Sequence, residues 1–580
     1  MCGIFGFVGE QEESSSIIVE SLRRLEYRGY DSWGIALIDR GAIFMDKHVG
    51  KIGEAQPIVR ASTVALGHTR WATHGGVLDK NAHPHTDCAK RFALVHNGIV
   101  ENHTELKKKL VLLGHRFRSD TDSEVIVHLV EEKFKTKKFK EAVFGAFREL
   151  KGSNAIGIFD SKGGELVACR NGSPLVVGVG EGINYLASDV TAFLDRTRNA
   201  IPLRDGEGVV LTTKAPELYD LSGKKKKVRI EKIEWEQESI ELGSFPHYLL
   251  KEIYEQAKTV PKTRLLNEKA RESLVKSIRK GARVVLVGCG TAAHCAHAAK
   301  YLFAHAGIKT ESFGAYEFLP FARSYGKGSI AFFVSQSGET ADTLIAARQA
   351  KKEGAHIVAV VNARGSTLER MADTVLAVGS GPEIAVVSTK AFTAQLATLY
   401  TLVQKVARKK IEIPSEKELL GLIKKLDVQM RKVAERLVHQ ERMFLIGKYD
   451  EYVAALECAL KIKETSYIHA EAFSSGELKH GVITLITPGI PCIVLANDVK
   501  TFSEVCASAA EIKSRGGYII GLATKEAPEF DEFIKLPKFT PGLIAIPSVI
   551  ASQLLAYHLA VLRGADPDKP RNLAKSVTVK

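Results

Sequence analysis

The sequence has few cysteines, and its first residues lack the basic region of a signal peptide. Eight cysteines occur in 580 residues, and no two of them form a CxxC pair. So few thiols in a long chain exclude the disulfide framework on which small secreted domains depend. Acidic residues follow early, at Glu10 and Glu12, which argues against a signal peptide. We therefore expect a protein of the reducing cytoplasm.

One stretch of membrane-spanning length lacks charged residues. Residues 542–562 contain no Asp, Glu, Lys or Arg. Polar residues and Pro547 interrupt them. We expect a short strand at Leu543–Ile546, followed by a buried helix, and no membrane span.

The charge is shifted toward basic residues, with 81 Lys and Arg against 67 Asp and Glu and a formal net charge of +14. The basic residues are spread along the chain apart from one dense run, Lys224–Lys227. Such a run is typical of a solvated turn or linker, so we expect no nucleic-acid partner. A basic surface also attracts phosphorylated metabolites.

The chain length predicts several domains, because 580 residues are too many for one hydrophobic core. Short β-type runs mix with helical stretches over 2–215, which predicts an α+β domain. The Lys-rich residues 216–248 are the expected linker. Strand-length apolar runs then alternate with helical segments, and this pattern starts twice. It predicts two doubly wound parallel-sheet domains, 249–412 and 413–562, before a polar tail, 563–580. The fold class is therefore α/β and multidomain.

Cys2 follows the initiator methionine, and a small second residue allows that methionine to be removed. The α-amine of the new terminus titrates near neutral pH and can act as general base for the thiol on the same residue. The thiolate that results is a strong nucleophile. Position alone favours a small hydrophobic residue at the edge of the first strand, so the catalytic interpretation depends on the segments that follow.

Three further segments, 28–32, 68–75 and 96–102, are dense in polar groups. Asn97 and Gly98 can offer a side-chain amide and a backbone N–H to one oxyanion. Arg70 can hold a carboxylate with its guanidinium fork, and Asp122 can pair with an ammonium. A substrate with carboxylate, ammonium and amide ends is glutamine.

The segments CGIFGFVG, RGYDS, HTRWATHG, HNGIVENH and SDTDSE resemble the N-terminal-nucleophile (class II) glutamine amidotransferase domain. The resemblance implies an Ntn-hydrolase-type fold for residues 2–215. It implies that Cys2 is the nucleophile, with its own amine as base, and that Asn97 and Gly98 form the oxyanion hole. The resemblance also implies that Trp71 gates the passage of ammonia. The residues that it implies for glutamine binding are Arg70, Thr73, His74 and Asp122.

Six histidines lie between His68 and His103, but no Cys/His spacing supports a metal site there. We expect these histidines to make ordinary polar contacts. The sequence therefore predicts neither a metal nor another cofactor.

Two loops of the third region can bind phosphate. Residues 288–293, GCGTAA, follow a predicted strand and fit a GxGxxA dinucleotide loop, with Glu311 a strand further on. A sugar-phosphate loop is the alternative, and residues 335–340, SQSGET, favour it. They place three hydroxyls beside the N-terminal N–H groups of a predicted helix, which together form a cradle for phosphate.

Glu457, Lys461 and Glu464 fall on one face of a predicted helix, at i, i+4 and i+7. By spacing alone, an exposed Glu–Lys ladder is the favoured interpretation. The polar segments HAE at 469–471 and GELKHG at 476–481 follow.

These segments resemble paired sugar isomerase (SIS) domains. The order of one amidotransferase and two SIS domains, with the tail RNLAKSVTV, resembles the glutamine–fructose-6-phosphate aminotransferase family over nearly the whole chain. That resemblance implies L-glutamine and D-fructose 6-phosphate as substrates, glucosamine 6-phosphate as product, and ammonia passed between two sites. It also implies a homodimer, and the first step of amino-sugar synthesis.

The same resemblance implies roles at the second site. Lys575 would form a Schiff base with the C2 ketone, and His480, reaching in from the other subunit, would open the sugar ring. Glu464 would move a proton between C1 and C2, with Lys461 assisting, since one carboxylate can serve two neighbouring carbons. The implied sugar-phosphate contacts are Thr291, Ser335, Gln336, Ser337, Thr340, Val386, Ser388 and Ala574.

Two positions depart from the family pattern. Trp33 stands where relatives often carry a small residue, which changes the packing behind RGYDS. Ala292 follows GCGT, where relatives tend to carry Ser, and the change is mild if the backbone N–H at that position makes the sugar contact.

Two other functions stay open. A different class II amidotransferase could deliver ammonia elsewhere, although the chain contains no SGGxDS loop and no phosphoribosyltransferase acidic signature. A non-enzymatic sugar-phosphate sensor is the second alternative. No helix-turn-helix segment stands out, and the intact Cys2 and Lys575 also argue against a sensor.

Overall fold

The computed structural model describes residues 2–53, 55, 60–233 and 241–577. The chain divides into two compact units. Unit 1 takes in the residues up to 240 and those from Ala574 on, and unit 2 takes in residues 241–573.

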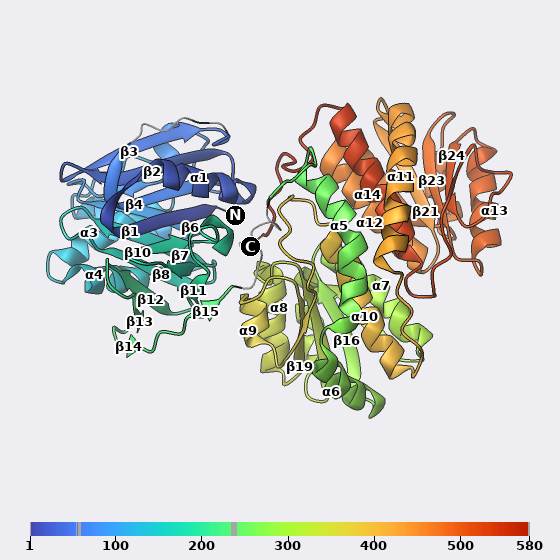
Figure 1. Ribbon diagram of the computed structural model, residues 1–580, viewed down its shortest axis with the longest axis horizontal. Coiled ribbons are helices and arrows are strands. Elements are labelled where there is room, and N and C mark those ends of the chain that lie inside the picture. Colours follow the sequence, from blue (N-terminus) through green and yellow to red (C-terminus); the bar gives the residue numbers. More distant parts are fainter. Residues whose placement is uncertain (1, 54, 56–59, 234–240, 578–580) are drawn as a thin grey trace. The chain divides into compact units, whose positions relative to one another are not determined.

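Unit 1 is built on two antiparallel sheets (Figure 1). Within the described residues, the first sheet has eight strands, in the order β15 (Glu231–Lys232), β11 (Asn199–Pro202), β9 (Val176–Val179), β10 (Ile183–Ala187), β1 (Gly3–Ser14), β4 (Ala61–Arg70), β2 (Ser32–Asp39) and β3 (Ala42–Val49). The second has seven, again counting described residues, in the order β14 (Lys225–Lys226), β13 (Glu217–Asp220), β12 (Glu207–Leu211), β8 (Leu166–Asn171), β7 (Asn154–Asp160), β6 (Phe92–Gly98) and β5 (His85–Thr86).

The alternation of side chains along β1 explains the layers of unit 1. Ile4 and Val8 point into a core that both sheets share, whereas Phe5 and Phe7 point to the opposite face. Helix α1 (Ser16–Leu25) covers that face. The outer face of the second sheet is covered by α2 (His103–Leu112), α3 (Glu124–Phe134) and α4 (Phe139–Phe147). Two sheets between two helical layers confirm the predicted α+β class.

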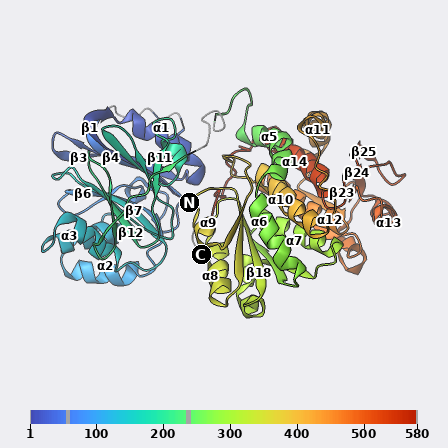
Figure 2. The same cartoon turned by 60° about the horizontal axis from the view of Figure 1, so that its bottom comes forward.

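Unit 2 contains two parallel sheets (Figure 2). Their strand order is the same. In the described part of the chain each has five strands, arranged 2-1-3-4-5 when numbered along its own half. The first is β17 (Thr310–Gly314), β16 (Arg283–Gly288), β18 (Ser329–Ser335), β19 (His356–Val361) and β20 (Thr374–Ala377). The second is β22 (His469–Ser474), β21 (Arg442–Gly447), β23 (Pro491–Ala496), β24 (Tyr518–Ala523) and β25 (Glu532–Lys535).

Helices pack on the faces of both sheets, which confirms the doubly wound prediction. The helices of the first half are α5 (Tyr248–Lys262), α6 (Glu268–Arg279), α7 (Thr291–His305), α8 (Ala341–Lys352), α9 (Thr367–Met371) and α10 (Lys390–Val406). Those of the second half are α11 (Glu416–Leu437), α12 (Asp450–Ser466), α13 (Phe502–Lys513) and α14 (Ala545–Leu562).

The two halves of unit 2 begin with the same turn, as the predicted duplication requires. A Cβ on Gly288 or on Gly447 would lie 2.6 or 2.4 Å from the carbonyl oxygen four residues further on. Two residues later, Gly290 has φ 54° and ψ −128°, and Tyr449 has φ 55° and ψ −120°. This backbone conformation suits glycine, so the second copy keeps the turn with a residue that is strained there.

The expected strand at Leu543–Ile546 is wrong. The last strand of the sheet is β25; Leu543 and Ile544 lie in the turn before α14, and the helix begins at Ala545. Pro547 lies in the first turn of that helix, where its missing N–H costs no hydrogen bond. By length and composition α14 could cross a membrane, but 83% of it is buried, and it packs against α11 and α12 (Figure 1).

Part of the expected linker forms strands. β13, β14 and β15 lie within it and extend the two sheets of unit 1, whereas residues 234–240 lie outside the described residues. The basic run is exposed, as predicted, and two of its lysines pair with carboxylates: Lys225 with Glu217 and Lys226 with Glu207.

Gly447→Ala is expected to lower the stability of unit 2, because its Cβ meets the backbone of α12. The loss should exceed about 1 kcal/mol. Gly421→Ala, in the exposed interior of α11 with open space around its Cβ, should instead gain about 0.5–1 kcal/mol. Calorimetric unfolding of both variants tests the pair, and equal melting temperatures would contradict the reading of the turn.

Candidate functional site

Cys2 lies beside the start of β1, where the ends of β4 and β6 come together. The Trp71 backbone N–H donates a hydrogen bond to the Cys2 sulfur at 3.2 Å. The side-chain amide of Asn97 donates to the Cys2 carbonyl oxygen at 2.9 Å. The structure therefore brings together three of the residues that the sequence singles out.

The Asn97 side chain is oriented by His68, which sequence reasoning missed although it lies in the HTRWATHG segment. His68 Nε2 lies 3.0 Å from both the Asn97 side-chain oxygen and the His96 carbonyl oxygen. Both are acceptors, so Nε2 carries a proton. Burial lowers the pKa of His68 to about 3, which keeps the ring neutral. The amide nitrogen of Asn97 is thereby turned toward Cys2.

Gly98 ends β6 in a conformation that requires glycine. Its φ is +133°, and a Cβ would lie 1.9 Å from the Ser153 carbonyl oxygen. The next backbone groups are fixed by Asp122, whose carboxylate accepts a hydrogen bond from the Val100 N–H at 2.7 Å. The Asn97–Gly98 edge therefore has no side chain at Gly98 that could block it.

The charges around Cys2 act in opposite directions on its thiol. Burial raises the pKa of Cys2, the Trp71 N–H and the Arg70 guanidinium lower it in part, and the Asp122 carboxylate raises it further. The thiol is therefore protonated at neutral pH until a base takes the proton.

Arg70 is buried and donates hydrogen bonds to the carbonyl oxygens of His74, Gly75 and Gly76, so it fixes the turn that follows β4. Within this turn Thr73 is exposed and His74 is half-buried. Trp71 packs edge-on against Tyr30, with ring centroids 5.5 Å apart.

Buried histidines form a stack in unit 1, and the ring centroids of His68 and His83 are 4.1 Å apart. Burial also lowers the pKa values of His83, His85 and His96, so these rings are uncharged. Trp33, which departs from the family pattern, is buried and stacks on His48 at 4.6 Å.

In the first half of unit 2, the strand order changes direction between β16 and β18. Ligands of such sheets bind at this point, outside the carboxyl ends of the strands. Residues 335–340 follow β18 there: the Ser335 hydroxyl accepts from the Gly338 N–H at 2.9 Å, and the Ser337 hydroxyl accepts from the Glu339 N–H at 3.2 Å. Thr340 is the N-cap of α8, and its side chain makes no capping bond. The hydroxyls and the first N–H groups of α8 thus share one loop.

Three other implied sugar contacts lie in two later segments of the chain. The Ser388 hydroxyl donates to Glu383 at 3.0 Å, and the Val386 N–H donates to the Asp568 carbonyl oxygen at 2.9 Å. Ala574 and Lys575 fall in the part of the tail grouped with unit 1, so their roles stay predictions. The loop at 288–293 also fits a dinucleotide-binding pattern in which Glu311 is the acidic residue. Glu311 pairs with Lys300 at 3.4 Å.

A buried ion network joins α12 to α7, and the expectation of an exposed Glu–Lys ladder is wrong. The side chains of Glu457 and Lys461 are 0% and 1% exposed. The Lys461 ammonium lies 2.9 Å from the Thr291 hydroxyl, 3.3 Å from Glu457 and 2.7 Å from Glu464. Three acceptors thus surround its three N–H groups.

The opposite end of the network is closed by His294, which sequence reasoning missed. Its Nδ1 lies 2.7 Å from the second oxygen of Glu457, and the Thr291 hydroxyl donates to the first at 3.1 Å. Thr291 and His294 lie one turn apart on α7, which was the available signal. Burial opposes charge here, yet Lys461, His294 and Thr291 hold the pKa of Glu457 below its usual value. In spite of burial, Glu457 and Glu464 raise the pKa of Lys461.

Glu464 completes the network at its outer end, with 19% of its side chain exposed. The side chain is therefore partly exposed, although Oε2 is buried beside the Lys461 ammonium that fixes its position. His480 is exposed at the end of a short 3₁₀ helix, Leu478–His480.

Comparison with known proteins agrees with this division. Residues 1–208 match the glutamine amidotransferase domain, and residues 277–405 and 436–563 each match the SIS domain. The chain is therefore an amidotransferase domain followed by two SIS domains.

Full-length relatives identify the family within this class of domain combination. The chain is 42% identical over 601 residues to the glutamine–fructose-6-phosphate aminotransferase (isomerizing) of Pyrococcus horikoshii, and 42% identical over 605 residues to that of Thermus thermophilus, with both chains covered completely in each case. The C-terminal domain of the Francisella tularensis glucosamine–fructose-6-phosphate aminotransferase is 32% identical, with a TM-score of 0.51, and covers 56% of this chain and 99% of its own. The chain belongs to the glutamine–fructose-6-phosphate aminotransferase (isomerizing) family.

Lys461→Met is expected to destabilise unit 2 by roughly 3–5 kcal/mol, because it leaves the buried Glu457 without its cation. Glu457→Gln combined with Lys461→Met should lose less than Lys461→Met alone. Arg431→Met removes one partner of an exposed i,i+4 pair, Arg431–Glu435, and should change stability by about 0.5 kcal/mol at most. Calorimetry measures all three, and a Lys461→Met variant as stable as Arg431→Met would contradict the buried network.

Proposed function

We propose that this protein converts L-glutamine and D-fructose 6-phosphate into L-glutamate and glucosamine 6-phosphate. One observation carries the proposal: a single chain holds a half-buried thiol at residue 2 beside an oriented amide, and also a hydroxyl-rich helix start at the switch point of a parallel sheet. The first arrangement suits release of nitrogen from an amide. The second suits binding of a sugar phosphate.

In the first half-reaction the Cys2 thiol gives its proton to the α-amine of the mature N-terminus and attacks the glutamine carboxamide carbon. The Asn97 amide and the Gly98 N–H stabilise the oxyanion. Ammonia leaves with a proton, and water then hydrolyses the thioester to glutamate and free thiol. Arg70 and Asp122, with Thr73 and His74, bind the α-carboxylate and α-ammonium ends of glutamine, and Trp71 gates the ammonia.

In the second half-reaction the phosphate of fructose 6-phosphate lies on the loop at 335–340, held by Ser335, Gln336, Ser337 and Thr340. Lys575 forms an imine with the C2 ketone and releases water, and ammonia then displaces the lysine amine. Glu464 takes a proton from C1 and returns it to C2, which turns the ketose imine into the aldose amine. Lys461 holds Glu464 in place, and Thr291, Val386, Ser388 and Ala574 contact the sugar.

A homodimer in the cytoplasm completes the proposal. His480 is exposed on its own protomer, which suits a ring-opening role in the site of the other subunit. Neither nucleic acid nor a membrane takes part. The two alternatives, ammonia delivered to another acceptor and a sensor without turnover, predict no glucosamine 6-phosphate.

Cys2→Ala should abolish synthesis from glutamine, by roughly a thousandfold or more, because the nucleophile is lost. Synthesis from free ammonium and fructose 6-phosphate should continue. Cys506→Ser, which removes another thiol in α13, is the control and should keep both reactions. The assay quantifies glucosamine 6-phosphate from each nitrogen source. Glutamine-dependent synthesis by Cys2→Ala would refute the nucleophile.

Lys575→Ala and Glu464→Gln should each abolish synthesis from both nitrogen sources, because they act on the sugar. Glutamine hydrolysis by the same variants should persist. Lys569→Ala, in the tail before the RNLAKSVTV segment, is the matched lysine control. Full synthase activity in Lys575→Ala or in Glu464→Gln would refute the role given to that residue.

A further inference from the structure

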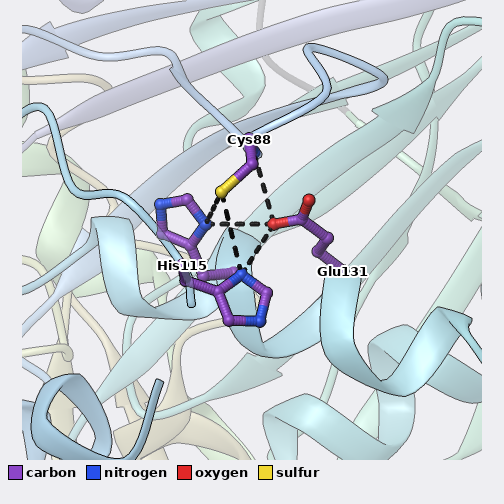
Figure 3. A group of neighbouring side chains, drawn as sticks. Cys88, His115 and Glu131 are labelled. Atoms are coloured by element: carbon purple, nitrogen blue, oxygen red, sulfur yellow. Dashed lines mark hydrogen bonds and ion pairs between the residues drawn. The ribbon is translucent and has the colours of Figure 1, made fainter. Parts of the chain in front are cut away.

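Four side chains of unit 1, none of them among the residues of the Cys2 site, converge on one point (Figure 3). The Cys88 sulfur, the Nδ1 atoms of His115 and His128, and a carboxylate oxygen of Glu131 all lie within 4.8 Å of one another. Neither half of the proposed reaction uses any of them. A thiol, two imidazoles and a carboxylate are the ligand types that zinc prefers in proteins.

The separations suit a tetrahedral ion. The Cys88 sulfur lies 3.9 Å from His115 Nδ1 and 3.6 Å from His128 Nδ1. Glu131 Oε2 lies 2.8 and 3.1 Å from the same two nitrogens. Ligand bonds of about 2.0–2.3 Å at tetrahedral angles place neighbouring donor atoms about 3.3–3.6 Å apart. Four of the six separations thus lie within about 0.6 Å of these values, and the other two are at most 4.8 Å.

Each histidine also has a carboxylate at its other ring nitrogen. His115 Nε2 lies 2.9 Å from Glu132, and His128 Nε2 lies 3.5 Å from Glu124. Metal-bound histidines typically donate this second N–H to a carboxylate, which fixes the ring and its tautomer. Glu124 is itself held by the backbone N–H groups of Arg118 and Ser119 at 2.8 and 2.7 Å. The outer carboxylate is thus in place for His115, whereas His128 Nε2 forms no hydrogen bond with the Glu124 carboxylate 3.5 Å away.

The four residues come from three parts of the fold. Cys88 lies in the turn between β5 and β6, His115 lies just after α2, and His128 and Glu131 lie one turn apart on α3. The Arg116 backbone N–H donates to the Cys88 sulfur at 3.4 Å. An ion at this point would join a sheet edge to two helices.

A plain histidine–carboxylate network is the competing explanation, because Glu131 could accept hydrogen bonds from both rings. It does not explain why the Cys88 sulfur, besides accepting a hydrogen bond from the Arg116 N–H, also faces the same two nitrogens (Figure 3). His128 is fully buried and His115 nearly so. We propose that Cys88, His115, His128 and Glu131 bind one zinc ion per chain as a structural site. Four protein ligands leave no open position for substrate, which distinguishes a structural from a catalytic zinc.

The first test is the metal content of the full-length protein. Purified wild-type chain, dialysed with Zn²⁺ and then freed of loose metal, should hold one zinc per chain by atomic spectrometry. Replacement by Co²⁺ should give a thiolate-to-cobalt charge-transfer band and the intense visible bands of a tetrahedral ion. Wild-type protein without bound zinc, or a cobalt spectrum without the thiolate band, would overturn the proposal.

Variants locate the ion. Cys88→Ser should lose the thiolate band and most of the zinc, and His128→Gln should lose most of the zinc. Cys506→Ser should keep both. Cys2→Ala should also keep one zinc, because a terminal thiol and amine can themselves chelate metal; loss of the ion in that variant alone would overturn the assignment. Chelation should lower the melting temperature of the wild type and leave that of Cys88→Ser unchanged.

Discussion

The buried pair Glu457–Lys461 is the constraint on which the second unit depends. Two charges without access to water are tolerated only because hydrogen-bonding and ionic partners surround them. Those partners come from α7 of the first SIS domain and α12 of the second, so the pair fixes the two copies against each other. Glu464 projects from the same network and is thereby held relative to α7, which starts at the loop after β16. Charge pairing, rather than apolar packing alone, thus sets where the Glu464 carboxylate lies.

In both units the chemistry is placed at strand ends. In a sheet of order 2-1-3-4-5 the loops after the first and third strands diverge at the switch point. In the first copy the loop at 335–340 places hydroxyls and a glycine there. In unit 1 the start of β1 and the ends of β4 and β6 bring Cys2, Trp71 and Asn97 within hydrogen-bond distance. His68 orients Asn97 in unit 1, and His294 pairs with Glu457 in unit 2. Their sequence positions gave only weak signals of these contacts.

Much of the architecture could be predicted, because the buried strands of a parallel sheet have continuous apolar runs in the sequence. That rule failed at Leu543–Ile546, because a short apolar run also fits the first turn of a buried helix such as α14. Spacing placed Glu457 and Lys461 on one helical face but could not tell a surface from an interface between domains. The Cys88 group was missed because its ligands are 27, 13 and 3 residues apart, a pattern that only the packing of α2 and α3 on the sheet edge makes compact.

The turn that opens each half of unit 2 differs in charge between the two copies. Where the first copy offers Gly290 and Thr291, the second offers Tyr449 and Asp450, followed by Glu451. Burial, with the Asp498 carboxylate as the second cause, raises the pKa of Asp450 to about 7, so a further negative charge at this turn is disfavoured. The second copy therefore keeps the backbone of the turn but places carboxyl groups where an anion would need N–H groups and hydroxyls.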